Sequence, residues 1–136
     1  MYPMRFELKS FETASLQGKI ATLQAGLEFL IASNLAYLEK NSAPPLYSAG
    51  IRYTPDVPGL DEKWKDIPQV ITTRAGNCKE FGAWRAAELR AAGDALARCI
   101  VMHTPTGKNQ LFHILVRRGD GQIEDPSRIL GMPEPT

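Results

Sequence analysis

The chain has 136 residues, of which 43% are hydrophobic and 23% are charged, and its formal net charge is +1. This length predicts one domain, residues 1–136, large enough to bury a single core. A charge so close to zero gives no electrostatic reason to expect a nucleic-acid or membrane partner. No apolar run approaches the roughly 20 residues needed to span a bilayer.

The N-terminus and the cysteine content bear on the cellular compartment. Residues 1–11 lack the basic-then-apolar order of a signal peptide, so no export route is expected. The two cysteines, Cys78 and Cys99, are too few for a disulfide framework, and a bridge between them is not expected without export. We therefore expect a reducing compartment such as the cytoplasm.

The first segment, residues 1–43, predicts an arm followed by a long helix. Residues 5–11 alternate weakly, which favours a short strand or an extended arm, and Ser10 or Thr13 is the candidate cap of the helix that follows. Asn41, followed by two prolines, ends it. An apolar stripe recurs at steps of mostly three and four, and we expect it to be buried against the rest of the domain, with a partner helix or an oligomer contact as the alternative. The stripe comprises Leu16, Ile20, Leu23, Leu27, Leu30, Ile31 and Leu38.

The second segment, residues 44–76, is typical of an ordered surface loop. Five prolines and two glycines lie between Pro44 and Pro68, and no hydrophobic period is sustained there. We expect the loop to lead into a short helix near Lys63 to Val70, with Trp64 packed as an anchor.

The third segment, residues 77–132, predicts a helix and then a small antiparallel sheet. Asn77 is a good N-cap, and Glu80 three residues later completes a capping box for a helix that ends at Gly93. Two β-rich runs follow, "ALARCIVMH" and "LFHILVRR", separated by the turn-like "TPTGKNQ". "GDGQ" then predicts a tight hairpin turn into "IEDP". Helices followed by an antiparallel sheet indicate an α+β fold.

The stretch "RAGNCKEFG" places Cys78 at the first position of the predicted helix. A helix start supplies N–H groups without intrahelical partners and the positive end of the dipole, and both favour a thiolate. Lys79 beside the thiol favours it further, and Gly76 allows close approach of a substrate or of the backbone. The Cys78 N–H is also placed to stabilise an oxyanion. The simpler alternative is that Cys78 is a buried small hydrophobic residue.

A thiolate nucleophile needs a base, and His113 is the better placed of two histidines. Strand alternation puts Phe112, Ile114 and Val116 on the face opposite His113, so its imidazole points away from the expected core. Asp125 follows the hairpin and falls roughly opposite residues 113–115, within reach of that ring. Alternatively, His113 is an ordinary sheet histidine and Asp125, before a proline, a turn residue.

The remaining candidate groups favour no metal or cofactor. Cys78, Cys99, His103 and His113 are ligand types for zinc, but their spacing lacks the short knuckles of zinc sites, and no acidic calcium loop is present. Cys99 lies mid-strand and is interpreted as core filler. His103 ends its predicted strand with no nearby carboxylate, which makes it the weaker base. Six arginines, interleaved with carboxylates, are interpreted as a solvated surface, with Arg118 and Arg128 as candidates for binding an acidic substrate. They are Arg85, Arg90, Arg98, Arg117, Arg118 and Arg128.

Two stretches, "GNCKEFGAWRAAELRAAG" and "IEDPSRILGM", resemble the transglutaminase-like cysteine domain, a relative of the papain-type proteases, and most of all its short stand-alone versions from bacteriophage and related genomes. The resemblance spans about Trp64 to Met132. It implies a cysteine-bearing helix packed on an antiparallel sheet, with Cys78 as nucleophile, His113 as general base and Asp125 as orienting carboxylate. Where the family usually has acidic residues around the cysteine, this chain has Asn77 and Lys79.

By this resemblance the chemistry is acyl transfer through a thioester on a protein or peptide substrate, by hydrolysis, deamidation or crosslinking, and it requires no metal. We expect a peptidase, amidase or deamidase before a crosslinking transglutaminase. The alternative is a bacteriophage virion or assembly protein that keeps the fold without using the triad; it would be virion-associated, with virion or self-assembly partners. A third hypothesis is a peptide-binding module that does not cleave.

Overall fold

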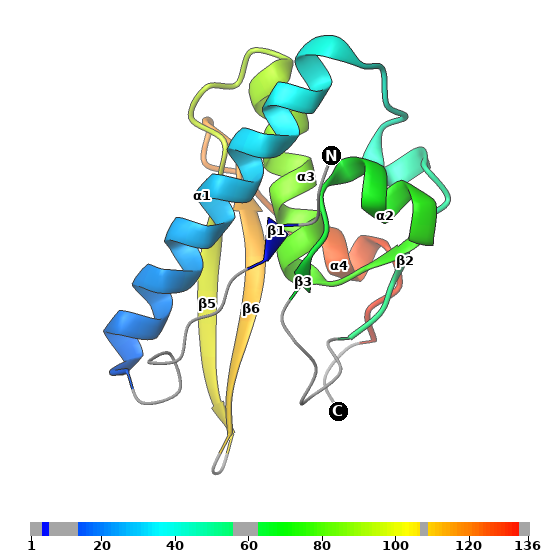
Figure 1. The fold of residues 1–136 in the computed structure, drawn as a ribbon. Helices are drawn as coiled ribbons and strands as arrows, with labels where there is room; N and C mark the ends of the chain where they lie inside the picture. Colours follow the sequence, from blue (N-terminus) through cyan, green and yellow to red (C-terminus); the bar gives the residue numbers. More distant parts are fainter. Residues whose placement is uncertain (1–3, 6–13, 56–62, 107–108, 134–136) are drawn as a thin grey trace.

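The computed structural model describes residues 4–5, 14–55, 63–106 and 109–133, which form a mixed α+β fold with a long N-terminal helix and small sheets (Figure 1). The helices are α1 (Leu16–Lys40), the 3-10 helix η1 (Leu46–Ser48), α2 (Ile67–Thr73), α3 (Cys78–Ala91) and α4 (Pro126–Ile129). The strands are β1 (Met4–Arg5), β2 (Arg52–Tyr53), β3 (Lys63–Trp64), β4 (Ala75–Gly76), β5 (Arg98–Thr106), β6 (Asn109–Arg117) and β7 (Ile123–Glu124).

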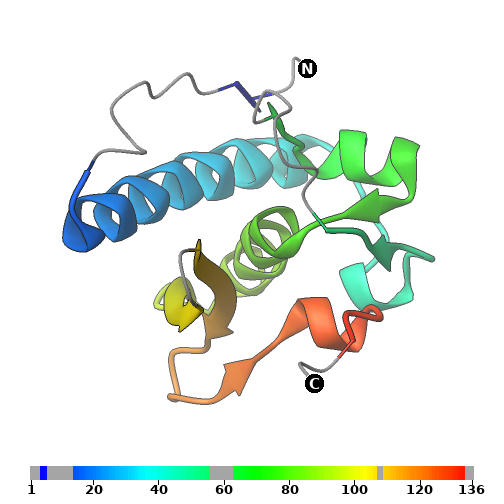
Figure 2. The same ribbon diagram turned by 90° about the horizontal axis from the view of Figure 1, so that it is seen from below.

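Helix α3 is the central element of the fold. Figure 2 shows α1 on one side of it and the long hairpin β5–β6 and α4 on the other. Helix α2 and η1 also contact α3. A side chain that points out of α3 therefore meets another part of the chain on most sides, and residues at its start are placed by several neighbours at once.

Helix α1 begins at Ser15, whose hydroxyl oxygen accepts a hydrogen bond from the Gly18 N–H at 3.0 Å. The expected caps, Ser10 and Thr13, lie outside the described residues, and the prediction that one of them caps the helix is wrong because Ser15 fills that role. Asn41 ends the helix as predicted, its N–H donating to the Tyr37 carbonyl at 2.9 Å. Most of the predicted arm, residues 5–11, lies outside the described residues. Only its first residue is described, as part of strand β1.

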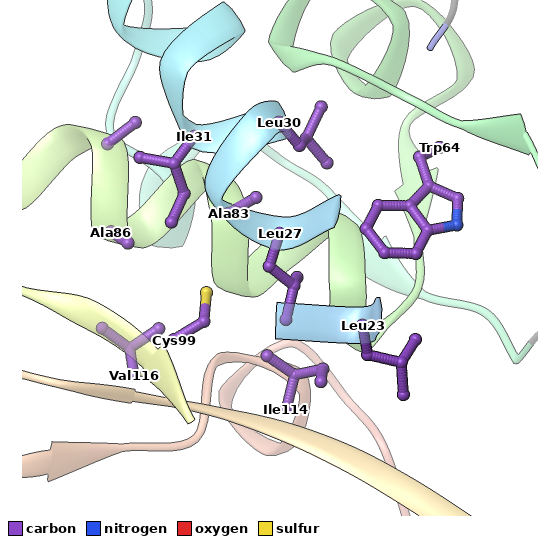
Figure 3. Packing of buried hydrophobic residues seen from close by; sticks show 11 residues of the cluster. Leu23, Leu27, Leu30, Ile31, Trp64, Ala83, Ala86, Cys99, Ile114 and Val116 are labelled. Carbon is purple, nitrogen blue, oxygen red and sulfur yellow. The ribbon is translucent and has the colours of Figure 1, made fainter. Parts of the chain in front are cut away.

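The middle of the α1 stripe is buried, as expected, whereas Leu16 at its start is 37% exposed. The buried part packs on α3 and β5, which confirms burial within the domain for this part of the helix (Figure 3). Each large aliphatic side chain buried in this way contributes about 1.5–3 kcal/mol. The buried residues of this cluster are Leu23, Leu27, Leu30, Ile31, Trp64, Ala83, Ala86, Ala87, Cys99, Ile114 and Val116.

The loop-rich segment differs from its prediction in where its helix begins. Lys63–Trp64 forms strand β3, antiparallel to β1, and α2 starts only at Ile67. Asp66 sets this start because its carboxylate accepts from the Gln69 N–H at 3.2 Å, while the Gln69 side chain accepts from the Asp66 N–H at 3.2 Å. Trp64 is 3% exposed, as expected of an anchor.

The C-terminal sheet has the order β5-β6-β7, and all its pairs are antiparallel. The β5–β6 register runs from Arg98 opposite Arg117 to Thr106 opposite Asn109, so both strands continue through the stretch that was expected to be a turn. His103 is consequently inside its strand and not at its end. The second hairpin forms as predicted, with the Arg118 N–H donating to the Gln122 carbonyl at 2.8 Å and Gly121 at φ +93°.

Candidate functional site

The start of α3 has the predicted capping box. The Asn77 side-chain oxygen accepts from the Glu80 N–H at 3.1 Å, and the Glu80 carboxylate accepts from the Asn77 N–H at 3.0 Å. Cys78 is therefore the first helical residue, as expected, and it is half-buried against the hydrophobic cluster shared by α1, α3 and the sheet. The capping box fixes the direction of the backbone N–H groups in the first turn of α3.

The turn before Cys78 is held by contacts that the sequence pattern does not reveal. The Lys65 ammonium donates to the Ala75 carbonyl at 2.7 Å and to the Thr73 hydroxyl at 2.9 Å, and the Lys65 N–H donates to Glu80 at 2.7 Å. A Cβ at Gly76 would lie 2.7 Å from the Phe81 ring, so only glycine fits there. Glu80 and Lys65 together fix the approach of the chain to Cys78.

Lys79 was expected to act on the neighbouring thiol. In the structure it is buried, and its ammonium lies 5.5 Å from the centroid of the Trp64 ring. A cation over an indole face is attracted by about 0.5–2 kcal/mol. This contact ties the first turn of α3 to β3.

His113 and Asp125, predicted from the sequence to meet, are hydrogen-bonded. The His113 Nε2 atom lies 3.0 Å and 2.9 Å from the two carboxylate oxygens of Asp125. An ionised carboxylate only accepts, so Nε2 carries the proton and Nδ1 is the ring nitrogen left to act as a base. Asp125 also caps α4 through the Arg128 N–H at 3.3 Å, and its carboxylate lies 3.3 Å from Arg128 Nε.

The faces of β6 also agree with the prediction. Ile114 and Val116 are fully buried on the α3 side, and Phe112 packs against the same cluster, whereas the His113 side chain is 27% exposed. Glu124 pairs with Val116, which brings Asp125 next to Leu115, within the predicted span. Because Asp125 begins α4 and α4 packs on α3, the His113–Asp125 pair lies where the sheet, α3 and α4 meet.

Cys78 lies near the level of Phe112 on the side of β6 that faces α3, and Phe112 directly precedes His113 in the strand. Strand β6 and α3 run in the same direction (Figure 1), and a Cβ at Gly82 would lie 2.7 Å from Ile114 Cγ2, which aligns these two residues. Cys78 is one turn earlier on the same helix face, about 6 Å back, or roughly two strand residues. The fold brings His113 of β6 and Asp125 of the β7–α4 junction into contact, and Cys78 begins the helix that packs against β6.

A partly buried ion-pair network beside Asp125 was missed. The Glu124 carboxylate accepts hydrogen bonds from Arg85 Nε at 2.7 Å and from a second Arg85 nitrogen at 3.1 Å. It also accepts hydrogen bonds from the Tyr47 hydroxyl at 2.5 Å and from Arg118 Nε. Arg85 also donates to Glu88 at 3.0 Å. The interpretation of all six arginines as solvated surface is wrong for Arg85, which is mostly buried, and Arg118 and Arg128 pair with internal carboxylates.

These contacts determine how Glu124 titrates. Although burial alone raises the pKa of its carboxyl, the hydrogen bonds from Arg85, Tyr47 and Arg118 outweigh burial and lower the pKa to about 2. Burial, together with the same bond to Glu124, raises the pKa of the Tyr47 hydroxyl above its usual range. Glu124 is therefore ionised throughout the range in which a cysteine enzyme would work.

Acid should weaken this network in a defined window. The folded-state pKa of Glu124 lies below the ordinary value of 4.5, so its stabilisation is present above that value and lost as the pH falls toward about 2. We expect the difference in unfolding free energy between wild type and Glu124→Gln to be largest above pH ~5 and to shrink toward pH ~2. Urea titrations followed by circular dichroism at several pH values measure this. A difference independent of pH would contradict it.

The other sulfur and imidazole groups do not form a metal site. Cys99 is 1% exposed, with its sulfur directed at α3 (Figure 3), and burial raises its pKa to about 12, which confirms it as core filler. His103 packs on Phe112 with ring centroids 5.4 Å apart. No disulfide joins Cys78 and Cys99. Within the described ranges, no three His, Cys, Asp or Glu residues are placed to hold a metal ion.

Comparison with known proteins adds no family to these observations. No family model, no curated protein and no solved structure matches the chain. Among the described residues, no helix has the length and apolar content that crossing a membrane requires.

Proposed function

We propose that this protein is a cysteine-dependent acyl-transfer enzyme with a transglutaminase-like core, acting on amide or peptide bonds of a protein or peptide substrate. Hydrolysis or deamidation is favoured over crosslinking. The observation that carries the proposal is the His113–Asp125 hydrogen bond, made by a strand that packs against the helix beginning with Cys78. A histidine oriented by a carboxylate in this way is the pair that serves a nucleophile in triad enzymes, and we assign that nucleophile to Cys78.

Each residue has one role in the proposed reaction. The Cys78 sulfur attacks the substrate carbonyl carbon as its proton passes to His113 Nδ1, and the Cys78 N–H stabilises the oxyanion. The C–N bond breaks, the amine leaves with the proton from His113, and a thioester to Cys78 remains. His113 then takes a proton from water, whose oxygen attacks the thioester carbon. The C–S bond breaks, a carboxylic acid is released, and the proton on His113 is shared again with the Cys78 sulfur. Asp125 keeps Nε2 protonated and the ring in place throughout.

An activated ester tests the nucleophile without knowledge of the natural substrate. With p-nitrophenyl acetate, we expect a burst of nitrophenol and an acetyl group on Cys78, located by mass spectrometry of the digested protein. Cys78→Ser should lose the burst, whereas Cys99→Ser, a matched change at the buried thiol, should keep it. A burst that survives in Cys78→Ser, or wild type without an adduct on Cys78, would contradict the proposal.

The second candidate is a bacteriophage virion or assembly protein in which the triad is unused. The observation that favours it is Phe29, 63% exposed on α1, since aromatic residues are enriched at interfaces between proteins. In this case Cys78 forms no acyl adduct, the protein is present at stoichiometric copy number in purified particles, and Cys78→Ser assembles normally. Absence from particles would contradict it.

A further inference from the structure

Glu124 stands directly before Asp125 and makes far more contacts than a strand residue needs. Its carboxylate accepts four hydrogen bonds, from Tyr47, from two nitrogens of Arg85 and from Arg118, and its side chain is only 12% exposed. Bidentate arginine–carboxylate pairs fix geometry as well as charge. The position of Glu124 is therefore closely determined.

The contacts of Glu124 reach back to the helix that begins with Cys78. Arg85 belongs to α3 and is held on its other side by Glu88, whose carboxylate accepts from the Leu46 N–H at 2.7 Å and from the Trp84 ring N–H at 3.1 Å. The guanidinium also lies 4.8 Å from the centroid of the Tyr47 ring. Strand β7 is thus attached to α3 and η1 through a continuous network.

The elements that hold Asp125 are short by themselves. Strand β7 has two residues, paired with Val116 and Arg117 of β6, and α4 has four. A two-residue ladder and a single helical turn fix a side chain weakly because few hydrogen bonds offset the cost of ordering the backbone. Burial of Pro126 and Ser127 and the packing of α4 on α3 help to hold the β7–α4 junction, and the contacts of Glu124 add to them.

We propose that Glu124 is a positioning residue: clamped by Arg85, Tyr47 and Arg118, it fixes the β7–α4 junction so that Asp125 stays hydrogen-bonded to His113. This role rests on the function proposed above for Cys78 and His113. The clamp joins the element that carries the carboxylate to the helix that carries the nucleophile, so it sets their relative placement. It touches neither the substrate nor the reacting atoms.

The chain offers a matched control. Arg90, also on α3, makes a two-nitrogen pair with Glu28 of α1, at 3.1 Å and 2.9 Å, but the Glu28 side chain is 46% exposed and distant in sequence from the β7–α4 junction. Glu28→Gln therefore breaks an ion pair of α3 without altering the junction, whereas Glu124→Gln breaks the clamp.

The test follows the His113 ring proton by NMR in protein labelled with ¹⁵N in its histidines. The chain has two histidines, so loss of one signal in His113→Gln assigns it. In wild type we expect the Nε2 proton of His113 to be protected from solvent exchange. Glu124→Gln should raise its exchange rate about tenfold or more by local opening, and Tyr47→Phe, which removes one of the four hydrogen bonds, about threefold. Glu28→Gln should stay within about twofold.

The outcomes separate the clamp from the enzyme proposal. Unchanged exchange in Glu124→Gln, an equal rise in Glu28→Gln, or an unprotected proton in wild type overturns the clamp. If Glu124→Gln does not fold, unchanged exchange in Tyr47→Phe overturns it. The His113 ring proton can be protected through Glu124 in a protein whose Cys78 is no more reactive than free cysteine. That result supports the clamp and contradicts the proposed function.

Discussion

Replacing His113 by glutamine should slow the alkylation of Cys78 by iodoacetamide at pH 6 about a hundredfold, because the ring nitrogen that accepts the thiol proton is lost. Glutamine keeps a side chain of similar reach that can still hydrogen-bond to Asp125. The rate is measured by mass spectrometry of the Cys78 peptide in a Cys99→Ser background.

The matched control is His103→Gln. His103 lies on the neighbouring strand, directly opposite Phe112, and contacts no described carboxylate. Its replacement should leave the alkylation rate within about threefold of wild type. Equal rates in wild type and His113→Gln would show that the thiol is not activated by this imidazole.

Replacing Gly82 by alanine should destabilise the protein by about 1–2 kcal/mol, although alanine is the better helix former by about 1 kcal/mol. The added methyl group would lie 2.7 Å from Ile114 Cγ2 and 3.2 Å from the Cys99 sulfur. Ile114 is β-branched and fully buried, so it cannot rotate away, and α3 must move off β6. In the proposed site this displacement moves Cys78 away from His113, so Cys78 alkylation should fall as well. Urea unfolding and the alkylation assay measure the two effects.

A double-mutant cycle isolates the cause. Ile114→Ala removes the clashing methyl group and should offset at least about 1 kcal/mol of the Gly82→Ala cost, whereas Ile114→Val keeps that methyl group and should not. Gly18→Ala in α1, where the nearest atom to a Cβ would be Ser15 Oγ at 3.3 Å, serves as the helical glycine control. Additive effects of Gly82→Ala and Ile114→Ala would contradict close packing of α3 on β6 as the explanation.

The parts of the site that were predictable depend on local chemistry. Asn77 and Glu80 are three residues apart, and a capping box needs only that spacing, so the position of Cys78 at the helix start follows from the sequence. The His113–Asp125 contact was predictable because the short "GDGQ" turn fixes the register of the strands on either side.

The parts that were missed depend on partners far apart in the chain. Arg85 and Glu124 are separated by 39 residues, and no local pattern distinguishes a clamped arginine from a solvated one. Lys63–Trp64 is a strand because β1 pairs with it, although its local sequence favours a helix start. Strand β5 continues through Thr104 and Pro105 because β6 pairs with it there, which overrides the turn-like composition.

The pH dependence of Cys78 alkylation tests the central claim most directly: that the thiol at the start of α3 is activated by the His113–Asp125 pair. In the Cys99→Ser background, the account predicts a rate that stays nearly constant from about pH 5 to 7, since a cysteine activated by a paired histidine is already a thiolate at these pH values. A rate that instead rises about tenfold per pH unit up to about pH 8.5, as for free cysteine, would contradict it.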